Sequence, residues 1–285
     1  MAAPPVAGEP LSPELIARTC QSLAQIYAAA KYVEVFVDEV RSWPIVQLAL
    51  ERQRVAARTP RSSRREAAEA AALELMALPP EQWAVVLAAL APPQQKATLQ
   101  RVLAAAGPFT RTEPDRAHRL GGSILRVVRS DRLPPRAPLL RRRLAGHALL
   151  LRARALMTLG AYADALPVVA EAHATFPRDV TCARDRMQAQ LLRGQLLGAT
   201  GHVADALQTL NACAEFAVDR MDMPELVDAL AAAAVVLCTC REYGVARSAL
   251  ALAAHVAGRP GNEASLPALH ASLAECAFLG YPDDS

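Results

Sequence analysis

Apolar residues recur at near-helical spacing from the first part of the chain onward. Over residues 12–42 they predict one or two helices, which Ser12 and Pro13 begin as N-cap and first-turn proline. Pro44 interrupts the pattern, because the residue before a proline avoids helical backbone angles. A helix is expected again over 45–57.

The next elements are marked by prolines and glycines. Proline in a first turn loses no hydrogen bond, so the proline pairs at 79–80 and 92–93 predict two helix starts. A loop is expected over 107–114, followed by helices over 115–129 and from about 137 to 159. Because Ala and Leu dominate and aromatic residues make up only 4% of the chain, we expect an all-helical fold.

The second half of the chain repeats itself about every forty residues. The segment 160–166 is echoed by 201–207 and more faintly by 241–247, and the equivalent positions lie 41 and then 40 residues apart. Self-similarity with such a period is typical of stacked helical pairs. Each pair buries an apolar face on the next and leaves a curved surface free for a partner.

These repeats resemble the tetratricopeptide family, in which antiparallel helix pairs stack into a right-handed superhelix. Small residues let the helices cross closely, glycines close the turns, and Arg241 takes the place of one turn glycine. The resemblance covers about residues 145–280. In its first unit it rests on Ala153, Leu156, Gly160, Tyr162, Ala165, Val169, Ala172 and Pro177.

The predicted organisation has three parts. Residues 1–10 are expected to be disordered, and 11–136 to form an irregular N-terminal helical region with a basic linker near 58–65. Residues 137–285 are expected to form a TPR-like α-solenoid that ends in a capping helix over about 263–279.

The resemblance implies a partner-binding groove lined by the first helix of each pair. That groove would hold a protein or peptide segment. The lysine and asparagine clamp of chaperone-binding members of the family is absent. Seven polar side chains fall on the expected surface: His147, Arg154, Thr158, Gln188, Gln195, Asp228 and Thr239.

Charge is unevenly distributed along the chain. Through Gly160 there are 23 basic against 13 acidic residues, and from Ala161 onward 8 against 15, which gives about +10 and −7. Head-to-tail self-association into a homo-oligomer is one prediction from this split. A second prediction is that the Arg-rich segment 111–143 contacts an anionic partner. The candidate residues are Arg126, Arg129, Arg141, Arg142 and Arg143.

The sequence contains no recognised catalytic, metal-binding or phosphate-binding motif. The six cysteines and six histidines show no metal-ligand spacing, and neither a nucleophile motif nor a phosphate-binding glycine loop is present. We therefore expect no catalytic residue, no metal ligand and no cofactor. No signal peptide or membrane-spanning stretch is recognised, so a cytoplasmic location is expected.

Two functions remain open, and a third is weaker. The first is a non-catalytic scaffold or adaptor whose TPR-like groove binds a protein or peptide. The alternative is a TPR-containing regulator that contacts nucleic acid through the Arg-rich N-terminal half, although no helix-turn-helix, zinc finger or basic zipper is present. The third is an enzyme with an unrecognised site.

Overall fold

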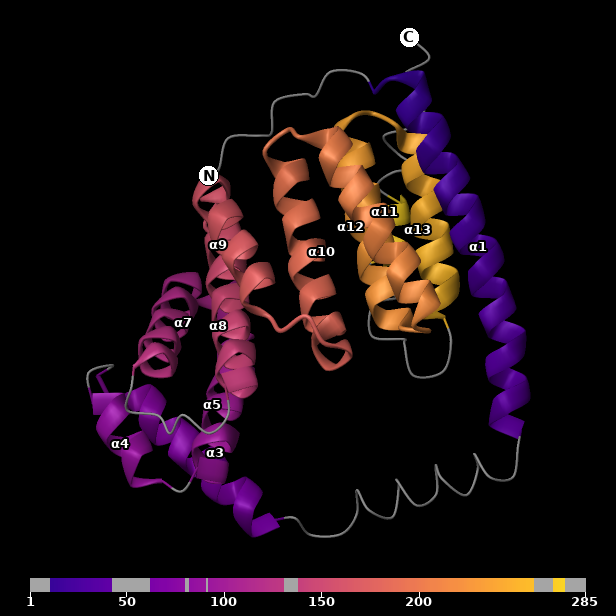
Figure 1. Cartoon of the computed structure of the whole chain (residues 1–285). Coiled ribbons are helices and arrows are strands. Elements are labelled where there is room, and N and C mark those ends of the chain that lie inside the picture. The colour runs from indigo at the N-terminus through magenta and orange to yellow at the C-terminus, as the bar shows by residue number, and fades with distance from the viewer. Residues whose placement is uncertain are drawn as a thin grey trace. The chain divides into compact units, whose positions relative to one another are not determined.

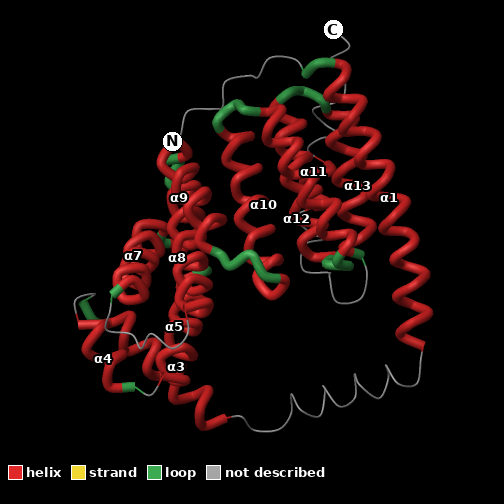
Figure 2. The backbone as a smooth tube through the Cα atoms, in the orientation of Figure 1, coloured by secondary structure: helices red, strands yellow, loops and turns green. Residues whose placement is uncertain are grey.

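The computed structural model confirms the expected all-α fold class, since no strand occurs among the residues that it describes (Figure 2). The predictions for 1–10, 45–57 and the first half of the basic linker, 58–61, lie outside these residues. The expected capping helix is described only at 269–274, where it is helical. The described residues are 11–42, 62–79, 82–90, 92–130, 138–258 and 269–274.

Figure 1 labels the helices in chain order. Those of the first half are α1 (Pro13–Ser42), α3 (Ser62–Ala77), α4 (Trp83–Ala89), α5 (Pro92–Ala106), α6 (Phe109–Thr112) and α7 (Pro114–Arg129). Those of the second half are α8 (Pro138–Thr158), α9 (Tyr162–Thr175), the 3-10 turn η2 (Val180–Cys182), α10 (Ala183–Ala199), α11 (Val203–Asp219), α12 (Met223–Thr239) and α13 (Tyr243–Ala257).

Two local predictions need correction. The second half of the basic linker, residues 62–65, belongs to the start of α3. The segment expected to be a loop contains α6, because Thr110 donates both its N–H (3.1 Å) and its hydroxyl (2.7 Å) to the carbonyl of Gly107. Pro108, with φ fixed at −56°, directs the chain into that turn.

Helix contacts divide the chain into two units. We name residues 48–189 the central unit and residues 1–47 with 190–285 the terminal unit. The division falls within α10 and differs from the boundary expected near residue 137. The reason is tertiary packing: α7 packs against α8, while α1 packs against α11 and α13.

In the terminal unit, glycines allow α10 to approach its neighbours closely. A Cβ at Gly194 would lie 2.7 Å from Leu210 on α11, and a Cβ at Gly198 would lie 2.5 Å from Val236 on α12. Helix α1 lies beside α13 (Figure 1) and buries Ile26, which is 2% exposed. Aliphatic side chains therefore fill the contacts between these helices.

Four helix ends in the second half share one hydrogen-bond pattern. One residue with positive φ donates its N–H to the carbonyl three residues earlier, and the next residue donates to the carbonyl five residues earlier, which is the Schellman motif. The positive-φ residues are Gly160, Gly201, Met221 and Arg241, with φ of 75°, 84°, 55° and 64°. Met221 joins α11 to α12, a connection that the repeat pattern did not indicate.

In the central unit, α8 packs against α5, α6, α7 and α9. Where α7 crosses α8, a Cβ at Gly121 would lie 2.6 Å from Cγ of Arg152. At the next crossing, a Cβ at Gly146 would lie 2.5 Å from the ring of Phe176, the residue that ends α9. Among the described residues, no helix is long and apolar enough to cross a membrane.

Candidate functional site: a basic and apolar cleft beside α8

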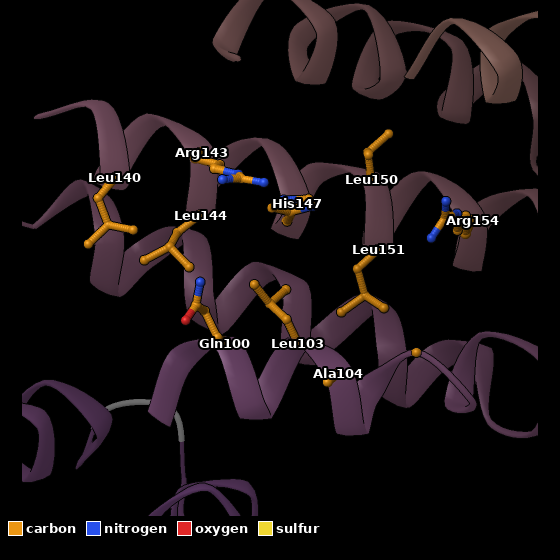
Figure 3. Close-up of a pocket in the computed structure, with 11 residues that line it drawn as sticks. Gln100, Leu103, Ala104, Leu140, Arg143, Leu144, His147, Leu150, Leu151 and Arg154 are labelled. Atoms are coloured by element: carbon orange, nitrogen blue, oxygen red, sulfur yellow. The ribbon is translucent and has the colours of Figure 1, made fainter. Parts of the chain in front are cut away.

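A cleft with a volume of about 340 Å³ lies between α5 and α8 of the central unit (Figure 3). Leu140, Leu144 and Leu151 of α8 point toward α5 in this view. Leu103 of α5 lies opposite them and Gln100 lies beside it. The floor of the cleft is therefore apolar and is built by two helices that are far apart in the sequence.

Basic side chains follow the same helix along the edge of the cleft. Arg143, His147 and Arg154 line it, at spacings of four and seven residues that place them on one side of α8. Arg154 is exposed, and the side chains of Arg143 and His147 are 44% and 32% exposed. The cleft thus joins a leucine-lined floor to a row of nitrogen donors.

Asp185, in the first turn of α10, holds one end of this row in place. Nε of Arg143 lies 2.6 Å from its Oδ2, and Nε2 of His147 lies 3.4 Å from its Oδ1. Burial alone would raise the pKa of this carboxyl. The hydrogen bond and charge of His147 and the charge of Arg143 outweigh burial and hold the Asp185 pKa below its ordinary value.

Phe176 fixes the other side of the imidazole. Its ring is 1% exposed and meets the His147 ring edge-on, with the centroids 5.2 Å apart. The ring can reach this position because Gly146 has no side chain. His147 therefore lies between an aromatic ring and a carboxylate, and these two contacts set the orientation of its ring beside the cleft.

The three consecutive arginines expected to contact an anion have separate partners within the protein. Arg141 donates to the carbonyls of Val128 (3.1 Å) and Ser130 (2.5 Å) at the end of α7. Arg142 donates to the carbonyl of Thr175 at the end of α9, at 3.1 Å. Successive residues of a helix point about 100° apart, so three neighbours in sequence reach three different helices.

The remaining two arginines of that prediction lie on α7. Arg129 forms an ion pair with Glu171 of α9, and Arg126 lies exposed in the last turn of α7. Basic residues at a helix C-terminus interact favourably with its dipole. These contacts give Arg129, Arg141 and Arg142 structural roles, and only Arg143 of the five lines the cleft.

Of the seven predicted groove residues, the structure brings two together in the cleft, His147 and Arg154. Thr158 is exposed on α8 and bonds its hydroxyl to the carbonyl of Arg154. Gln188 lies on the part of α10 that belongs to the central unit. The other three lie on α10 and α12 of the terminal unit: Gln195, Asp228 and Thr239.

The buried cysteines of the described residues are not activated as nucleophiles. Burial raises the pKa of the Cys213 thiol to about 12 and also raises the pKa of Cys182 and Cys240. Within the described part of the chain, no group of three histidine, cysteine or acidic side chains lies together as metal ligands would.

Comparison with known proteins gives no family assignment. No family model, no curated protein and no solved structure matches this chain. The site is therefore interpreted from its own geometry.

Proposed function

We propose that the protein is a non-catalytic adaptor that binds a segment of a protein partner, and that the cleft between α5 and α8 is its binding surface. The helix pairs of the second half, joined by a repeated Schellman turn, support a TPR-like arrangement for the scaffold. Such a scaffold presents helices rigidly and leaves side chains on one face for a partner.

One observation carries the proposal: the cleft combines an apolar floor with oriented polar groups. Binding sites are typically concave, mostly apolar and supplied with a few placed polar side chains. Here Leu103 and Leu144 supply the apolar part, and Arg143 and His147, both fixed by Asp185, supply the polar part. The volume of about 340 Å³ suits two or three side chains of an incoming segment.

Two adjacent alanines on α5 allow a matched test. Both are exposed, but Ala104 lines the cleft and Ala105 does not. We expect Ala104→Trp to fill the cleft and Ala105→Trp to leave it open. In an affinity pull-down from the protein's own cell extract, a partner retained by the wild type and by Ala105→Trp should be lost with Ala104→Trp.

The same experiment separates the alternatives. Equal retention by both tryptophan variants would contradict the cleft as the binding surface. Each sample is also treated with nuclease, and a loss of retention on that treatment alone would favour the nucleic-acid regulator instead.

A further inference from the structure

The charge of the cleft indicates the chemistry of its occupant. The central unit contains 23 arginine and lysine residues against 12 aspartate and glutamate residues, +11, whereas the terminal unit has 8 against 16, −8. The described residues that line the cleft include Arg143, His147 and Arg154 and no carboxylate. An acidic occupant is attracted to such a surface and a basic one is repelled.

Two of these side chains already bind a carboxylate of the protein next to the cleft. Arg143 and His147 converge on the carboxylate of Asp185, and their geometry is fixed before any partner arrives. Arginine has five N–H donors, and one carboxylate cannot occupy all of them. Because the Arg143 side chain is 44% exposed, its remaining donors can reach a second carboxylate at the mouth of the cleft.

The spacing of the two arginines sets the spacing of the acids. Arg143 and Arg154 are eleven residues apart on one helix, a rise of about 16 Å at 1.5 Å per residue. An extended chain rises about 3.3 Å per residue and its side chains alternate between opposite faces, so two carboxylates on one face are an even number of positions apart. A spacing of four covers about 13 Å, and the long arginine side chains span the remainder. Leu144 and Leu151 lie between the two arginines and face the leucine of α5.

We propose that the cleft binds an extended acidic segment of a partner protein, with carboxylates four positions apart and a leucine-sized side chain midway between them. The proposal rests on the proposed function and names its ligand class. The first carboxylate pairs with Arg143, the apolar side chain enters the floor, and the second carboxylate pairs with Arg154.

Two fluorescently labelled peptides of equal composition provide the probe. Gly-Asp-Ala-Leu-Ala-Asp-Ala-Gly has its acids four positions apart, and Gly-Ala-Asp-Leu-Asp-Ala-Ala-Gly has them two apart. Titrated with the full chain and followed by fluorescence anisotropy, the first peptide should bind about five-fold more tightly than the second. Replacing both aspartates by asparagine should weaken binding by about ten-fold or more.

A pair of arginine variants places the interaction in the cleft. Arg154→Gln removes a charge that lines it, and Arg178→Gln removes the same charge from an exposed position outside it. We expect Arg154→Gln to weaken the first peptide about five-fold and to abolish its preference over the second. Arg178→Gln should change both affinities equally and by less than about two-fold.

The outcomes that overturn the proposal are distinct from those that overturn the proposed function. Equal binding of the aspartate and asparagine peptides, or an equal effect of Arg154→Gln and Arg178→Gln, would refute the acidic segment. If Ala104→Trp still abolished retention of the cellular partner, the cleft would remain the binding surface. Duplex DNA provides one more test. If it competed with the peptide at equal nucleotide concentration and lost affinity with Arg154→Gln, the proposal would also be refuted.

Discussion

The central and terminal units both use glycines at helix crossings, but different side chains pack against these glycines. In each, glycines let helices approach until a neighbouring side chain occupies the missing Cβ position. The terminal unit fills these positions with Leu210 and Val236, whereas the central unit fills them with Phe176 and Arg152. Leu210 and Val236 carry no polar group. In the central unit, the Phe176 ring contacts His147, and the aliphatic stem of Arg152 carries a guanidinium that lies 3.5 Å from Nε2 of His118. In the central unit the packing therefore also positions His147, which lines the cleft.

Removing the aromatic filling should have the largest effect on this comparison. Phe176→Ala deletes a side chain that is 1% exposed, and we expect the free energy of unfolding to fall by about 3–5 kcal/mol. Leu210→Ala, the equivalent change in the terminal unit, should cost about 2–5 kcal/mol. Urea unfolding measures both.

Peptide binding separates the two variants further. Phe176→Ala also removes the edge contact to His147 and should weaken the acidic probe, whereas Leu210→Ala should leave its affinity unchanged under conditions where both variants are folded. Equal effects on binding would mean that the ring contributes stability alone.

Replacing the glycines at these helix crossings by alanine should have the next largest effect on stability. A Cβ at Gly146 would lie 2.5 to 2.7 Å from three atoms of the rigid Phe176 ring. A Cβ at Gly194 would meet two atoms of the flexible Leu210 side chain at 2.7 Å. We expect Gly146→Ala to destabilise by about 2–3 kcal/mol and Gly194→Ala by about 1–2 kcal/mol, measured by thermal unfolding.

Each unit contains its own control glycine. A Cβ at Gly122 on α7 or at Gly244 on α13 would meet no atom within 4 Å. Because alanine favours a helix over glycine, Gly122→Ala and Gly244→Ala should stabilise by about 0.5–1 kcal/mol. Destabilisation by all four substitutions would contradict the close-approach explanation.

Helical periodicity predicted the helices well, because burial against neighbours and local spacing agree. The expected helix over 115–129 is α7, and the expected start after Pro92 is that of α5. The connection at Met221 was missed because its left-handed residue is not a glycine. Arg241 is not a glycine either, but it lies at the repeat position of Gly160 and Gly201, whereas Met221 does not.

The candidate site was predictable only in part. His147 and Arg154 followed from their place on the first helix of a repeat, but Gln100 and Leu103 lie 44 to 54 residues earlier in the chain. Only the tertiary packing of α5 against α8 brings them to the cleft. The run of three arginines at 141–143 suggested one basic patch, and helical geometry instead distributes it among three helices.

The turn residues provide a smaller test, since the central unit has glycine at its Schellman turn and the terminal unit lacks it at two of three. A left-handed conformation costs a non-glycine residue about 1–2 kcal/mol, and glycine costs about 0.5–1 kcal/mol in unfolded-state entropy. Arg241→Gly should therefore stabilise by about 0.5–1 kcal/mol in thermal unfolding. Ala251→Gly, at an exposed position of α13, should destabilise by about 1 kcal/mol. Destabilisation by both would show that the turn at Arg241 stores no strain.

The smallest effect we expect is a pH dependence confined to the central unit. Burial, and then the charge of Arg152, lower the pKa of His118 below its ordinary value of 6.5; the backbone hydrogen bond of Arg152 and the charge of Asp115 oppose this. The guanidinium lies 3.5 Å from Nε2, so the neutral ring can accept from it. The unfolded chain then binds the proton more readily than the folded protein does.

Stability should consequently fall as the pH decreases from about 6.5 through the folded pKa of His118, and it should be constant above that window. His118→Gln should remove this dependence from the urea midpoint. Arg152→Met keeps the packing over Gly121 but removes the charge that is the second cause of the lowered His118 pKa. The folded pKa should then rise, so the pH range over which stability changes should end at a higher pH. If Arg152→Met left the pH window unchanged, burial alone would account for the lowered pKa of His118, and the contact between Arg152 and His118 across α7 and α8 would have no electrostatic consequence.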